Sequence, residues 1–164
     1  MGRNILIFFV FVVPFIESAL LGNAPLPFSA IALYPLVLLV VLRVFPWWQA
    51  LAFALLGGTW RDLVLLQPVS SSLIASLALV LVYGGLVLLL TNRSIVVSIV
   101  SSALAYAAYL FTFWGVSTLS DRLNPSAIIY QIDFVAWIGG LLLASIIAIV
   151  FRRQMHHQQL RLPF

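Results

Sequence analysis

The stretch "LLGGTWRDLVLLQPVSSSL", residues 55–73, decides the fold, because it joins an apolar helical run, a charged pair and a chain break. Arg61 and Asp62 stand side by side within the apolar run. Pro68 follows, and a proline disfavours helical backbone in the residue before it. Three serines come next, and serine hydroxyls accept hydrogen bonds from the free amides of a helix start. The stretch therefore predicts that one helix ends near residue 66 and that another, capped by serines, starts near residue 72.

The rest of the chain is too apolar for a soluble domain of this size. Hydrophobic residues make up 64% of its 164 positions, charged residues only 7%, and the mean hydropathy is +1.19. A soluble protein needs polar and charged side chains to cover its surface. We therefore predict an integral membrane protein whose partner is membrane lipid. The chain has no cysteine, which excludes disulfides and thiolate metal sites.

Six apolar segments are long enough to cross a membrane as helices, which takes about 20 residues each. Breaks rich in proline, glycine, asparagine or serine separate them, the last being "LSDRLNPS", residues 119–126. The strand alternation of a membrane β-barrel is absent. We predict an all-α, polytopic bundle of six transmembrane helices over residues 1–151, followed by a short cytoplasmic tail over residues 152–164. The predicted helices cover residues 5–22, 28–45, 47–66, 72–90, 95–116 and 128–150.

The basic residues, all of them arginine, predict the orientation of the bundle. With both termini in the cytoplasm, only Arg61 and Arg122 fall toward the outside, and the positive-inside rule favours this arrangement over its inverse. Because the arginines lie between hydrophobic runs, they indicate topology rather than nucleic-acid binding. The six arginines placed inside are Arg3, Arg43, Arg93, Arg152, Arg153 and Arg161.

Four ionisable residues are predicted to share one layer near the outer face. At about 1.5 Å of rise per residue, Glu17, Asp62 and Asp133 each lie roughly 6–8 Å below the outer end of their helix, level with Arg61. A charge in hydrocarbon costs several kcal/mol, so such residues turn inward and pair. We expect helices one, three and six to meet there. Adjacent helical residues point about 100° apart, so the predicted partner of Arg61 is Glu17 or Asp133, not Asp62.

Two interpretations of this layer stay open. It is either a structural feature, namely a polar clasp that fixes helix order or charges that snorkel to the nearby outer interface, or a pocket open to the outside for a solute or a partner helix. Catalysis is not expected, because no histidine or cysteine lies within a predicted span and no phosphate-binding loop is present. The pair Asp62 and Asp133 lacks the glycine-flanked motif of intramembrane aspartyl proteases. We therefore predict no enzyme activity, no cofactor and no metal.

Small residues and one proline predict how the helices pack. Repeats of small residues at every fourth position let helix backbones approach closely in lipid. Pro14 predicts a kink in the first helix, because it lacks the amide that would bond one turn back. The repeats are Ala50, Ala54 and Gly58 in the third segment, Ala103 and Ala107 in the fifth, and Ala136, Gly140 and Ala144 in the sixth.

The order of these features resembles the bacterial rod-shape-determining MreD family. The resemblance covers residues 5 to about 115: "FIESALLG" and a proline-containing loop, a helical hairpin, "LAFALLGGTWRDL", the turn "QPVSSSL", and a span that closes with "YGGLVLLLTNR". It implies a non-enzymatic, multi-pass subunit of the cell-elongation and peptidoglycan-synthesis machinery in the bacterial inner membrane. Its implied partners are an MreC-like single-span protein and the wall-synthesis complex, and Asp62 is its characteristic residue.

The MreD fold is similar to that of the substrate-binding subunits of energy-coupling-factor vitamin transporters. A transport subunit is therefore the alternative function, with a small-molecule ligand in the layer of Glu17, Arg61, Asp62 and Asp133. Such subunits carry an Ala-xxx-Ala contact in their first helix, whereas "ILIFFVFVVPF" offers no small residue. The scaffold function is therefore preferred.

Overall fold

The computed structural model of the protein describes residues 2–21, 32–66, 70–89, 95–123 and 134–150. These residues form six α-helices and one π-helical segment and contain no strand, so the all-α prediction is confirmed for the described part of the chain. The elements are α1 (Gly2–Ile16), η1 (Glu17–Leu21), α2 (Leu33–Val44), α3 (Trp47–Val64), α4 (Ser71–Leu89), α5 (Ile95–Leu123) and α6 (Phe134–Val150).

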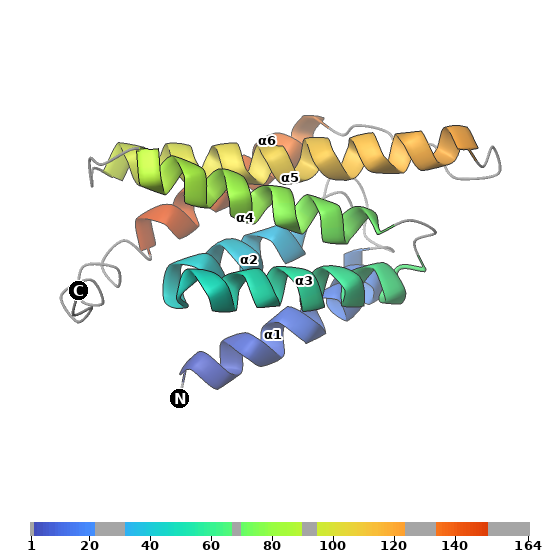
Figure 1. Cartoon of the computed structure of the whole chain (residues 1–164), viewed down its shortest axis with the longest axis horizontal. Helices are drawn as coiled ribbons and strands as arrows, with labels where there is room; N and C mark the ends of the chain where they lie inside the picture. Colours follow the sequence, from blue (N-terminus) through green and yellow to red (C-terminus); the bar gives the residue numbers. More distant parts are fainter. Residues whose placement is uncertain (1, 22–31, 67–69, 90–94, 124–133, 151–164) are drawn as a thin grey trace.

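The helices run alternately up and down, with α2 at the centre (Figure 1). α2 contacts every other α-helix, whereas α1 packs mainly against α2 and α3, and α4, α5 and α6 pack in chain order. We call the end where α1, α3 and α5 finish the Glu17 end, and the opposite end the Arg43 end. The core lies around α2 and is built from side chains such as Tyr34, Leu38 and Tyr109.

α2 is shorter than predicted and has sharp limits at both ends. Ala32 has extended backbone, so the helix begins at Leu33 instead of residue 28. Phe45 is also extended, as expected for a residue that precedes proline (Pro46). The 12 residues of α2 span about 18 Å, less than the roughly 30 Å of a bilayer's hydrocarbon core.

Two described helices are long and apolar enough to cross a membrane, namely α4 and the part of α5 up to Leu119. α3 has 18 residues, but Gln49, Arg61 and Asp62 lower its mean hydropathy. α6 has 17 residues and α1 has 15 before the π-helical segment. Length and composition therefore identify two membrane-spanning candidates among the described helices.

The end of α5 corrects one predicted boundary. The break was placed at residues 119–126, but α5 continues to Leu123 and has 29 residues. Ser120, Asp121 and Arg122 are polar but compatible with helix, so polarity misled the prediction. The first strong breaker is Pro125, which disfavours helical backbone at the residue before it.

Small residues form close helix contacts, as predicted for the α3 repeat and for Gly140 and Ala144 of the α6 repeat; the side chain of Ala136 is outside the described part. Ala50, Ala54 and Gly58 are buried, and a methyl group on Gly58 would meet the Leu73 backbone of α4 at 2.7 Å. In α5, Ala103 and Ala107 are half-buried, so neighbouring helices cover this repeat only in part. The side chains that α5 buries include Ser101, Ser102, Ala105 and Tyr106, and Tyr106 packs directly on Gly140 of α6.

Candidate functional site

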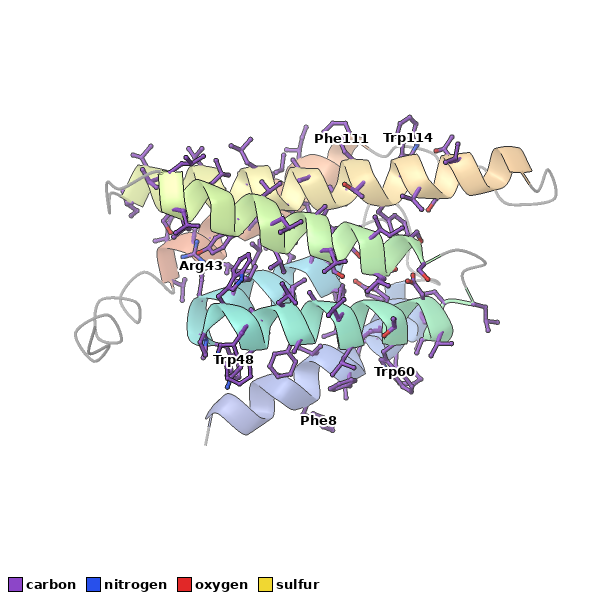
Figure 2. All side chains as sticks on the ribbon, in the orientation of Figure 1. Phe8, Arg43, Trp48, Trp60, Phe111 and Trp114 are labelled. Carbon is purple, nitrogen blue, oxygen red and sulfur yellow. The ribbon has the colours of Figure 1, made fainter. Side chains whose placement is uncertain are left out.

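The turn after Pro14 determines where Glu17 lies. α1 continues through Pro14 to Ile16, and the backbone then widens into the π-helical segment η1, whose first residue is Glu17. Pro14 has no amide hydrogen to donate to the preceding turn. The Phe11 carbonyl in that turn accepts a hydrogen bond from the Trp60 indole nitrogen at 3.0 Å. The bond links α1 to α3 nearly two turns before Glu17, and Figure 2 shows Trp60 at this end of α3.

Glu17 joins three helical elements through its two carboxylate oxygens. Oε1 accepts a hydrogen bond from the Tyr34 amide at 2.6 Å, in the first turn of α2. Oε2 accepts one from Nε of Arg61 in α3 at 2.8 Å, which makes an ion pair. A carboxylate is a favourable acceptor at a helix N-terminus, where amides have no partner within the helix. Glu17 therefore caps α2 and neutralises Arg61 at once.

Arg61 extends these contacts to α4 and α5. Its Nη1 atom donates to the Ser72 hydroxyl at 2.7 Å and to the Tyr109 hydroxyl at 3.0 Å. The guanidinium carbon lies 5.1 Å from the centre of the Phe113 ring, a distance typical of a cation–π contact. Arg61 therefore connects η1, α4 and α5 from its position in α3.

Asp62 caps a different helix from Glu17. Its two oxygens accept hydrogen bonds from the amides of Ser72 at 2.8 Å and Leu73 at 3.0 Å, in the first turn of α4. The predicted helix start in the serine run is confirmed, but serine capping of these two amides was wrong. The Ser72 hydroxyl instead accepts a hydrogen bond from Arg61. The carboxylate of Asp62, ten residues before Ser72, accepts the hydrogen bonds of the two amides.

These groups form what we call the polar clasp: Glu17, Arg61, Asp62, Ser72 and Tyr109. Of the two predicted partners of Arg61, the structure places Glu17 against it. Asp133, the other, lies outside the described residues. Within the described part, the remaining partners come from α2, α4 and α5 instead of α6. Tyr109 was not predicted as a member of this group; a hydroxyl in the middle of a predicted span was the available signal.

The clasp is closed to solvent. Glu17 is 8% exposed, and Arg61 and Asp62 are each 7% exposed. Every carboxylate oxygen of Glu17 and Asp62 accepts a hydrogen bond from another segment. Buried charges are stable when they are paired and hydrogen-bonded in this way. The arrangement is suited to holding five helical elements together.

The described residues offer no group of three histidine, cysteine, aspartate or glutamate side chains close enough to hold a metal ion. Comparison with protein-family models, curated proteins and solved structures finds no match to the chain.

Proposed function

We propose that the chain is a six-pass protein of the bacterial inner membrane, with both termini in the cytoplasm. The exposed apolar surface supports this: only 33% of the residues in the candidate spans of α4 and α5 are buried within the protein. Large exposed apolar side chains on a soluble protein would favour aggregation. Under this proposal the Arg43 end faces the cytoplasm and the Glu17 end faces outward.

We further propose that it acts as a non-enzymatic scaffold in cell elongation and peptidoglycan synthesis. The single observation that carries this choice is the closed polar clasp. A transport subunit would keep polar groups available to a small molecule, whereas Glu17 and Asp62 are occupied by helix amides and Arg61. The cell-elongation machinery is proposed because "LAFALLGGTWRDL" and its flanking segments resemble the MreD family. The proposed partner is an MreC-like single-span protein bound to the wall-synthesis complex.

Cysteine labelling tests the topology, because the chain has no native cysteine. Ser126→Cys, between α5 and α6, is expected to react with a membrane-impermeant maleimide in intact cells. Ser94→Cys, between α4 and α5, is expected to react only after the cells are permeabilised. The opposite pattern would show that the bundle has the inverse orientation. Labelling of both sites from outside would show that α5 does not cross the membrane and would contradict the six-pass proposal.

Partner capture tests the scaffold function. The tagged chain is purified from native membranes in mild detergent, and co-purifying proteins are identified by mass spectrometry, with an untagged strain as control. We expect a single-span shape protein and wall-synthesis enzymes, with no retained vitamin-sized molecule. Recovery of an ATPase module together with a bound small molecule would support the transport subunit instead and would contradict our proposal.

A further inference from the structure

A second buried arginine, Arg43, lies at the opposite end of the bundle from the polar clasp (Figure 2). It is 4% exposed and sits in the last turn of α2. Its Nη1 donates to the Ala148 carbonyl in the last turn of α6, and its Nη2 donates to the Ser98 carbonyl in the first turn of α5, each at 3.2 Å. Nη2 also donates to the Ser102 hydroxyl. Three helix ends therefore converge on Arg43.

Among the residues that the structure describes, no carboxylate forms an ion pair with Arg43. Glu17 and Asp62 are engaged in the polar clasp. Asp121 is 19 residues beyond Ser102 on the same helix, which is about 28 Å of rise. Carbonyl dipoles compensate Arg43 only in part, because a buried cation strongly favours an anionic partner.

Hydrogen-bond donors remain unused in Arg43 itself and in the turn of α5 that it contacts. Nε of Arg43 and the hydroxyls of Ser98 and Ser101 are buried and have no hydrogen-bond partner. An arginine nitrogen can only donate, so its partner must be an acceptor. Ser98 is half-buried, whereas Ser101 is 0% exposed, so Ser98 is the one of these two serines nearer the surface. The N-terminus of α5 lies within the same turn and also favours an anion.

We propose that Arg43, Ser98 and Ser101 form a binding site for a phosphate group. Phosphate offers several acceptor oxygens and a negative charge, and arginine is well suited to it. The donors lie within two turns of the helix ends, at the depth where lipid headgroups meet a bundle. The phosphate comes either from an anionic headgroup of the inner leaflet or from free inorganic phosphate. The lipid source rests on the proposed topology, which the cysteine labelling decides independently.

Thermal unfolding of the purified full chain in neutral detergent tests the site. Phosphatidylglycerol, phosphatidylcholine and inorganic phosphate are titrated separately, with sodium chloride matching the ionic strength. At a hundredfold excess over Kd, a specific ligand is expected to raise the Tm by about 5 °C or more. Arg43→Gln is expected to abolish this rise. The control Arg3→Gln removes the same charge from the start of α1 and is expected to retain it.

Ser98→Ala keeps the arginine and tests the site even if Arg43→Gln fails to fold. We expect a loss of affinity of about tenfold, as for a hydrogen bond to a charged group. A rise with phosphatidylglycerol alone identifies the lipid as the source, and a rise with inorganic phosphate identifies the free ion. An equal Tm with every phosphate probe and with chloride would overturn the proposal. An unchanged response in both Arg43→Gln and Ser98→Ala would also overturn it.

Discussion

The Glu17–Arg61 ion pair is expected to contribute more to stability than any other single contact of the polar clasp. Glu17→Gln keeps the size of the side chain and an oxygen for the Tyr34 amide, but it removes the charge that faces Arg61 at 2.8 Å. Two unit charges about 4 Å apart attract by about 4 kcal/mol at an effective dielectric constant of about 20. Breaking one partner of a buried pair costs about 3–5 kcal/mol. We therefore predict a loss of about 4 kcal/mol.

A double-mutant cycle separates the pair from its surroundings. Arg61→Met removes the cation and also the hydrogen bonds to Ser72 and Tyr109, so it has its own cost. In the double variant, neither side chain leaves an unpaired charge. We expect the double variant to be less destabilised than the sum of the two single variants by about 2–3 kcal/mol, because contacting residues are not additive.

The assay is reversible unfolding in mixed micelles, followed by tryptophan fluorescence. Ser18→Ala is the control, since Ser18 is the exposed neighbour of Glu17 in η1, and it is expected to change stability by less than about 0.5 kcal/mol. A coupling energy near zero would refute the reasoning, because the two charges would then behave as a solvated surface pair.

The other predictions use the same unfolding assay. Asp62→Ala should destabilise the protein by about 2 kcal/mol, because two amides at the start of α4 lose their acceptor; a change below 0.5 kcal/mol would contradict the cap. Gly140→Ala should cost about 1–3 kcal/mol, because the new methyl group meets Tyr106, whereas Gly139→Ala, with open space, should be neutral or stabilising. Leu66→Gly should stabilise by up to about 1 kcal/mol, because Leu66 has φ 51° and is 88% exposed; an equal gain from Leu66→Ala would show that backbone strain is not the cause.

Helix order was predictable because breakers stand between the apolar runs. Pro46 ends α2 and begins α3, and the serine run begins α4, close to the predicted positions. Apolar character alone located the start of α2 too early. Residues 28–32 are as compatible with a span as those that follow, and the true start depends on Glu17 reaching the Tyr34 amide from another helix.

The charged members of the clasp were predictable, but most of their partners were not. Opposite charges at one depth indicate that residues such as Glu17 and Arg61 must find partners. The acceptor for the α4 amides, however, is a carboxylate of the preceding helix, and this geometry depends on how α4 packs against α3. The π-helical turn at Glu17 has no clear signal beyond the nearby Pro14.

The clasp explains why a chain made mostly of hydrocarbon places charges beside each other in α3. Glu17, Arg61 and Asp62 together carry one net negative charge. Each carboxylate binds the first turn of a helix, and a helix N-terminus carries roughly half a positive charge. Two such termini, those of α2 and α4, therefore offset the excess without an external ion. Arg61 and Asp62 are adjacent, so their side chains point to different neighbours. Asp62 caps α4 directly, and Arg61 binds Glu17, which caps α2, so one turn of α3 contacts the caps of two other helices. A single charged residue at this position in α3 could bind at the start of only one of these two helices.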